Sequence, residues 1–202
     1  MTAAELFQQL VPRIGPAIET NLKRRDLCVF GVRVAMEVAR YFGIEVQPVA
    51  CQVAIYNRAF AMHIDEGDYD LRKWISVDGS YSIGIGFGHP PVGSTVGRWN
   101  GHLIAVADRV FADFSIWQAE RPQHGIIIGP GLMGPYSGAK QWTARNMAGV
   151  RIEYSRMEDE AYRRSPDWRS LNRRMKIAGA LIRELKTCKE IVHHVQWSIP
   201  EL

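Results

Sequence analysis

The 202-residue sequence has few cysteines and no long apolar run. Its three cysteines, at positions 28, 51 and 188, are odd in number and widely spaced, which argues against a disulfide framework and a CxxC zinc site. The sequence contains no stretch of about 18 consecutive apolar residues, which is the length that a membrane-spanning helix needs. Residues 1–15 lack the basic cluster, apolar run and cleavage site of a secretory signal. We therefore expect a reducing, cytoplasmic setting and no membrane partner.

Internal repeats and low-complexity linkers are also missing. The length suits one domain, so residues 1–202 are taken as a single domain. Hydrophobic residues make up 47% of the chain and charged residues 23%, which is enough apolar material for a core and argues against disorder. The net charge of +4 is too small to point to nucleic acid by itself.

The clearest helical pattern covers residues 27–42, LCVFGVRVAMEVARYF. Asp26 suits its N-cap and Gly43 the position after its end. One apolar stripe runs along it at helical spacing: Leu27, Phe30, Val34, Val38 and Phe42. A second amphipathic helix is predicted over residues 3–21, on the spacing of Leu6, Leu10, Ile14 and Ile18. We expect Pro12 and Pro16 to kink or split it.

The remaining patterns favour strands, a hairpin and one basic helix. IEVQPVACQVAIYN reads as one or two strands, with Pro48 at an edge or bulge. HLIAVAD and VFADFSIWQ read as a hairpin that turns at Asp108-Arg109, and residues 150–157 as a further strand. Residues 61–100 look like strand ends and a long surface loop. Since the strands are mostly consecutive and joined by hairpins, the predicted fold class is α+β with an antiparallel sheet.

The hairpin register brings a histidine and an aspartate together. If Asp108 and Arg109 are the turn residues, Ile104 faces Asp113. His102 and Asp113 are then diagonal neighbours on one face of the sheet, within reach of an imidazole–carboxylate hydrogen bond. Taken singly, His102 is also compatible with a hydrogen-bonded core or loop histidine, and Asp113 with a charge that guards an edge strand.

Cys28 falls in the first turn of the helix that Asp26 would cap. Unpaired backbone N–H groups and the positive end of the helix dipole favour a thiolate there, more so beside a protonated histidine. The same N–H groups suit an oxyanion. A cysteine on an apolar helix is also a common core residue. Together with His102 and Asp113, however, Cys28 completes a possible Cys-His-Asp catalytic triad.

The order of Cys at a helix start, His on a strand and Asp on the next strand resembles the papain-like cysteine proteinase superfamily, closest to its transglutaminase-like branch. The matching pieces are DLCVFGVRVAMEVARYFGIEVQPV and GHLIAVADRVFADFSIWQ, and the resemblance covers roughly residues 20–120. It implies a papain-like core with Cys28 as nucleophile, His102 as base and Asp113 as the group that orients the base.

Some family features differ in this sequence. Val29 and Phe30 stand where the transglutaminase cysteine is followed by tryptophan. Leu22 occupies the place of the papain-type glutamine, and Asn21 is out of step by one. The substrate class is therefore not inherited from the resemblance.

Around the triad, Trp99, Asn100 and Trp117 are candidate substrate-binding residues, although such aromatic residues are about as often part of a core. We expect no metal and no cofactor. His63 and Asp65 lie in a segment that reads as an acidic surface loop, and the adjacent pair His193-His194 is a poor ligand set.

Residues 167–190 form a basic helix, for which a nucleic-acid face is the less favoured reading. We expect its apolar stripe to pack on the core: Leu171, Met175, Ala178, Ile182 and Leu185. The sequence thus favours a cysteine hydrolase or acyltransferase that acts on an amide, peptide or isopeptide through a thioester. The alternative is a catalytically inactive binding module on the same fold, holding a protein or nucleic-acid partner.

Overall fold

The computed structural model describes residues 1–22, 28–67, 79–87 and 99–187. Its helices are α1 (Ala3–Leu22), α2 (Cys28–Tyr41), α3 (Arg58–Asp65), α5 (Pro166–Arg169) and α6 (Leu171–Thr187). Its strands are β1 (Gln47–Tyr56), β2 (Ser82–Ile85), β3 (His102–Ala107), β4 (Val110–Asp113), β5 (Leu132–Pro135), β6 (Gln141–Arg145) and β7 (Arg151–Arg156). Among these described helices, none is long and apolar enough to cross a membrane.

All the strands join one antiparallel sheet in the order β5-β4-β3-β1-β7-β6, with β2 added beside β1. The predicted α+β class with an antiparallel sheet is therefore confirmed. Strand β1 is the centre of the sheet and changes partner along one edge. Its first half, to Cys51, pairs with β3, and its second half, from Val53, pairs with β2. Pro48 lies in the part of β1 before Cys51, which β7 does not reach. The N–H group that proline lacks is therefore not missed by a neighbouring strand on that side.

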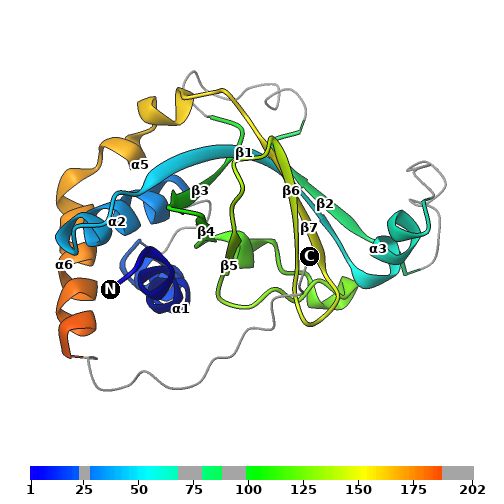
Figure 1. Cartoon of the computed structure of the whole chain (residues 1–202), viewed down its shortest axis with the longest axis horizontal. Helices are drawn as coiled ribbons and strands as arrows, with labels where there is room; N and C mark the ends of the chain where they lie inside the picture. Colours follow the sequence, from blue (N-terminus) through cyan, green and yellow to red (C-terminus); the bar gives the residue numbers. More distant parts are fainter. Residues whose placement is uncertain (23–27, 68–78, 88–98, 188–202) are drawn as a thin grey trace.

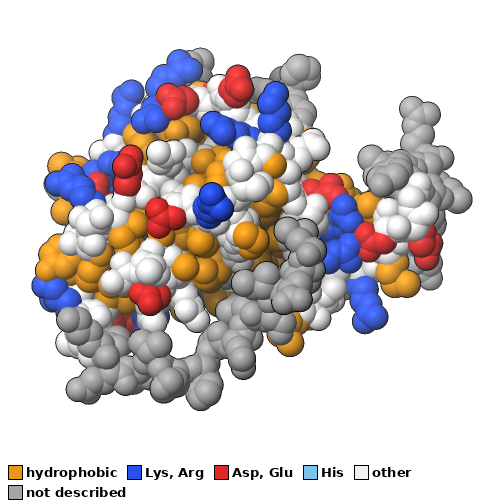
Figure 2. Space-filling view, viewed as in Figure 1, with side chains coloured by type: hydrophobic (Ala, Val, Ile, Leu, Met, Phe, Trp, Pro, Cys, Tyr) orange, Lys and Arg blue, Asp and Glu red, His pale blue; other side chains and the backbone are white. Residues whose placement is uncertain are grey.

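Helices α1, α2 and α6 gather against one face of the sheet, whereas α3 lies at the far end of β1 (Figure 1). Apolar side chains therefore form two main cores. The first lies between the helices and the sheet and includes Leu10, Phe30 and Leu103. The second lies on the other face and includes Ile104 and Tyr154. Figure 2 shows that acidic and basic side chains are mixed over the visible face, without a large area of one sign.

Helix α1 is continuous, so the predicted split at its prolines is wrong. The physical reason is their placement. Pro12 and Pro16 are both exposed, and solvent can reach the carbonyl groups that a proline leaves without a donor. The apolar stripe is buried as predicted: Leu6, Leu10, Ile14 and Ile18.

Helix α2 begins at Cys28, and Gly43 after its end has the left-handed φ of 73° that suits glycine at this position. The proposed N-cap, Asp26, lies outside the described residues. The predicted stripe is confirmed at Phe30, Val34 and Val38, which are buried against α1 and the sheet.

Two segments differ from the predictions made for them. Residues 58–65, expected to run from a strand end into a loop, form helix α3, which is capped by the Asn57 side chain through the Phe60 N–H. The strand predicted through residues 110–118 ends at Asp113. It ends there because the Asp113 carboxylate accepts the N–H groups of Ser115 and Ile116 and turns the chain into a short 3-10 helix.

The basic helix exists as α6, but its predicted buried face is wrong in part. Ala178 and Leu185 are buried, whereas Leu171 and Met175 are exposed. Arg174 is buried instead, because its guanidinium pairs with the Glu37 carboxylate at 3.1 Å and donates to the Trp168 carbonyl. An ion pair with α2 thus sets the rotation of α6 against the core.

Candidate active site

The hairpin of β3 and β4 has the predicted register, with Ala107 opposite Val110. Asp108 at its turn has a φ of 52°, as a tight two-residue hairpin turn requires. This register places His102 and Asp113 as diagonal neighbours. The His102 Nε2 lies 2.7 Å from the Asp113 Oδ2, so the expected contact between the two side chains is confirmed.

Asp113 is fully buried and accepts hydrogen bonds at both oxygens. Its Oδ1 accepts from the Ser115 N–H at 3.1 Å, the Ile116 N–H at 3.0 Å and the Ser115 hydroxyl at 3.4 Å. Its Oδ2 accepts from the Tyr154 hydroxyl at 3.0 Å, besides meeting His102. A carboxylate surrounded by donors can only accept, so the His102 Nε2 carries the proton that points at it.

Cys28 meets the same histidine from the helix side. Helix α2 packs on β3, and the half-buried Cys28 lies close enough to His102 to help raise the pKa of its imidazole. Since Nε2 faces Asp113, Nδ1 is the ring nitrogen left for the sulfur. The imidazole therefore bridges a thiol and a carboxylate, as nucleophilic cysteine catalysis requires.

Electrostatics favour the protonated form of this histidine. Burial lowers the pKa of His102, but the Asp113 carboxylate, by its charge and its hydrogen bond, and the Cys28 sulfur together raise it to about 10. His102 is consequently an imidazolium at neutral pH, with one N–H toward the carboxylate and one toward the sulfur.

Tyr154 is the member of this site that sequence reasoning missed. It lies on β7 and is fully buried, with its ring stacked on Trp142 at a centroid distance of 5.1 Å. Burial, followed by the charge of Asp113, raises the pKa of Tyr154 well above its ordinary value, so the hydroxyl remains a donor. The alternation of residues 150–157 indicates that Tyr154 points inward, but no sequence signal links it to Asp113.

Cys51 lies opposite His102 across β1 and β3, yet it lacks the setting of a nucleophile. It is fully buried, and its thiol points to the Val49 carbonyl at 3.8 Å. Burial and then the charge of Asp113 raise the pKa of the Cys51 thiol, which disfavours the thiolate. Cys188 lies outside the described residues.

The proposed substrate-binding residues 99 and 100 precede His102. The Trp99 indole N–H donates to Asp159 at 3.1 Å, and its ring lies over Gly101, where a Cβ would come within 2.4 Å of it. The glycine before His102 therefore leaves room for the Trp99 ring. Asn100 is exposed.

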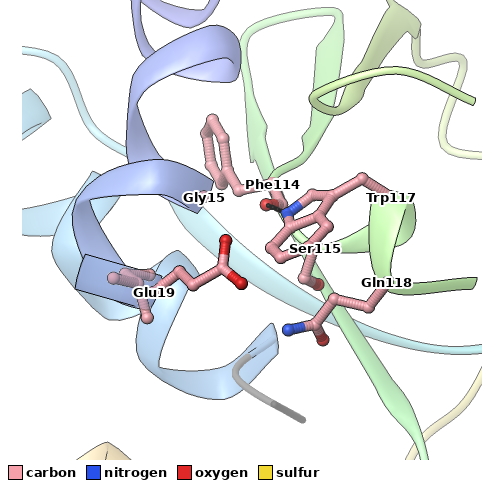
Figure 3. A pocket seen from close by; sticks show the side chains of 7 residues that line it. Gly15, Glu19, Phe114, Ser115, Trp117 and Gln118 are labelled. Carbon is pink, nitrogen blue, oxygen red and sulfur yellow. Dashed lines mark hydrogen bonds between the residues drawn. The ribbon is translucent and has the colours of Figure 1, made fainter. Parts of the chain in front are cut away.

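Trp117 borders a small pocket of about 10 Å³ between α1 and the turn after β4. Figure 3 shows Glu19 on one side and Gln118 on the other, extending toward the space beside the Trp117 indole. Ser115, which donates to Asp113, lines the same pocket. Of the three candidate substrate-binding residues, Trp117 thus borders a pocket that is also lined by Ser115, next to Asp113.

Metal ligands do not cluster within the part of the chain that the structure describes: no group of three or more His, Cys, Asp or Glu side chains is placed to hold an ion. His63 lies 3.7 Å from Glu66, and Asp65 pairs with Arg145 and Arg151. His193 and His194 lie outside the described residues.

No family model, curated protein or solved structure matches this chain.

Proposed function

We propose that the protein is a cysteine hydrolase or acyltransferase in which Cys28, His102 and Asp113 form the catalytic triad. One observation carries the proposal: the buried His102 contacts the buried Asp113 carboxylate at 2.7 Å, and the half-buried Cys28 lies close enough to the same imidazole to raise its pKa. Buried charges of this kind cost stability unless they are compensated, and perturbed titration is typical of functional sites.

In the first half of the reaction, the Cys28 sulfur attacks the carbonyl carbon of an amide or ester, and the electron pair moves to the carbonyl oxygen. Backbone N–H groups at the start of α2 are suited to stabilise that oxyanion. When the tetrahedral adduct collapses, the bond to the leaving group breaks and the His102 imidazolium gives its proton to the departing amine or alcohol. The products are the free leaving group and a thioester at Cys28.

In the second half, His102 takes a proton from water or from an acceptor amine, which attacks the thioester carbon. Collapse of this adduct breaks the C–S bond and restores the Cys28 thiolate and the His102 imidazolium. Water gives hydrolysis, and an amine gives acyl transfer. Asp113 orients the ring and stabilises its charged form throughout.

We further propose that the fold is a papain-like core of the transglutaminase-like kind. The support is the order of the parts: a Cys-bearing helix packed on an antiparallel sheet, with the His strand joined by a tight turn to the Asp strand. A thiol nucleophile also needs reducing surroundings, which suits the cytoplasmic setting expected from the cysteine content.

Selective alkylation tests the proposal. Native protein is treated with iodoacetamide at pH 7, and peptide mapping by mass spectrometry follows the labelling of each cysteine. Cys28 should be modified much faster than Cys51, which is buried and bonded, and the fast phase should vanish in Cys28→Ser. If native Cys28 stays unmodified while it reacts in the unfolded chain, the nucleophile proposal fails.

A further inference from the structure

Two adjoining pockets lie along α1 beside the proposed site. A small pocket of about 10 Å³ next to Ser115 shares Glu19 and Trp117 with a second, more open pocket of about 260 Å³. The second pocket is also bordered by Pro16, Glu120, Gly129 and Pro130. We call the two together the Trp117 groove.

The tryptophan that divides the groove is held in place. Its indole N–H donates to the Phe114 carbonyl at 3.2 Å. Its nitrogen edge rests against Gly15 of α1, where a Cβ would approach it to 2.6 Å. Since the edge is fixed and the ring is only partly buried, Trp117 gives the groove a rigid aromatic wall.

The charge of the groove has one sign. Among its described lining residues the charged ones are Glu19 and Glu120, and none is a lysine or arginine. One oxygen of Glu120 is fixed by the N–H groups of Ile128 and Gly129, at 2.8 and 2.7 Å. Glu19 is exposed and forms no ion pair with any residue of the described ranges. Arg121 is not a lining residue of the groove, and its Nη1 donates to the carbonyl groups of residues 118 and 120.

The groove begins next to the catalytic groups. Ser115, at its inner end, donates to the Asp113 carboxylate. On the helix side, a Cβ added at Gly31 would meet Ile18 at 3.5 Å and Phe114 at 3.7 Å, and both of these residues line the groove. Cys28 lies one helical turn before Gly31 on the same face of α2, because residues three apart share a face. Cys28 also packs against the apolar cluster that contains Ile18 and Phe114, which places the groove on the Cys28 side of the site as well as beside Asp113.

We propose that the Trp117 groove binds a basic side chain of the substrate, so that the enzyme prefers peptides with lysine or arginine next to the reacting carbonyl. The apolar stem of such a side chain packs on Pro16, Pro130 and the Trp117 ring, which also attracts its cationic head. Glu19 and Glu120 supply the opposite charge. This inference rests on the proposed cysteine chemistry at Cys28.

The test uses blocked dipeptide chloromethyl ketones in matched pairs, in which one probe carries lysine and the other carries norleucine. One pair has this residue next to the reacting ketone, and a second pair has it one position further away. The Cys28 sulfur displaces chloride and forms a thioether, and each rate is divided by the iodoacetamide rate of the same protein. In at least one position the lysine probe should react about fivefold to tenfold faster, an advantage that high salt reduces. Glu19→Gln and Trp117→Leu should each reduce the ratio toward one.

Glu184→Gln is the matched control, because Glu184 is an exposed glutamate that pairs with Arg13 on another part of α1. It should keep the lysine preference. Equal rates for the lysine and norleucine probes, with normal iodoacetamide labelling, would overturn the groove inference and leave the triad intact. A lysine preference that survives both groove substitutions would also overturn it. Failure of iodoacetamide to label Cys28 would instead refute the proposed function itself.

Discussion

Replacing Tyr154 by phenylalanine removes one hydroxyl from the centre of the site and little else. The ring keeps its places against Trp142 and Phe111, at centroid distances of 5.1 and 5.4 Å. A hydrogen bond to a charged group contributes about 1.5–3 kcal/mol, and we expect the lower end because Asp113 keeps its other donors. For a chain of this size, about 1.5 kcal/mol lowers the Tm by about 3–6 °C.

The more informative effect of Tyr154→Phe is on the histidine. The Tyr154 hydroxyl and the His102 N–H both donate to the Asp113 Oδ2. The hydroxyl therefore partly compensates the negative charge of this oxygen and weakens its attraction for the imidazolium. Without it, the pKa of His102 should rise further above its ordinary value. NMR titration of carbon-13-labelled histidine measures this directly, with the His102 signal assigned from the spectrum of His102→Gln.

Tyr136→Phe is the control for this experiment. The Tyr136 hydroxyl is buried without a hydrogen-bond partner among the described residues, and its ring also contacts Trp142. Its removal should leave the His102 titration unchanged. If Tyr154→Phe folds and its His102 midpoint stays constant or falls, the hydroxyl does not share the charge of Asp113 and the reasoning is refuted.

Three further predictions concern the triad and the helix that packs behind it. Asp113→Asn should slow alkylation of Cys28 at pH 7 by about tenfold, measured by peptide mapping, because the imidazolium loses its counter-charge; an equal rate would leave Asp113 a structural residue. The pKa of His102 is raised from 6.5 to about 10, so between these pH values the folded chain holds a proton on His102 that the unfolded chain has lost. The contribution of protonated His102 to folding stability is therefore complete below about pH 6.5 and is lost as the pH rises through about 10. Urea unfolding between these values should show a decline that His102→Gln flattens, and a parallel decline in the variant would contradict the shift. Arg174→Met should cost about 3 kcal/mol in the same assay, because it breaks a buried ion pair while Glu37 keeps Arg33 as a partner. The exposed Arg173→Met should cost almost nothing, and similar losses in both variants would mean that the pair does not fix the helix.

The hairpin was predictable because local rules determine it. Once Asp108 and Arg109 are the turn, the period of two along each strand decides which side chains share a face. The contact between His102 and Asp113 follows from that register alone. Similarly, the spacing of apolar residues in α2 and the glycine after it define a helix whose first turn holds Cys28.

Contacts between distant segments were not accessible in the same way. Tyr154 reaches Asp113 only because β7 pairs with β1 and closes the far side of the sheet. The rotation of α6 depends on the ion pair between Arg174 and Glu37 of α2. The sequence of α6 alone does not indicate that Arg174 is the basic residue that points inward. Helix α3 was missed for a different reason. Its eight residues are too few for a clear period, although Asn57 was a usable cap signal.

The central position of β1 has a consequence for how the chain folds. The hairpin of β3 and β4 closes through two turn residues, so its loop-closure entropy is small and it can form early. Strand β1 must instead find β7 across almost half of the chain, a contact of high sequence separation that slows folding. The histidine and aspartate are therefore expected to meet before the helix with Cys28 docks on the completed sheet. In the proposed enzyme, the Cys28 thiol would therefore gain its histidine partner only when α2 docks on the sheet.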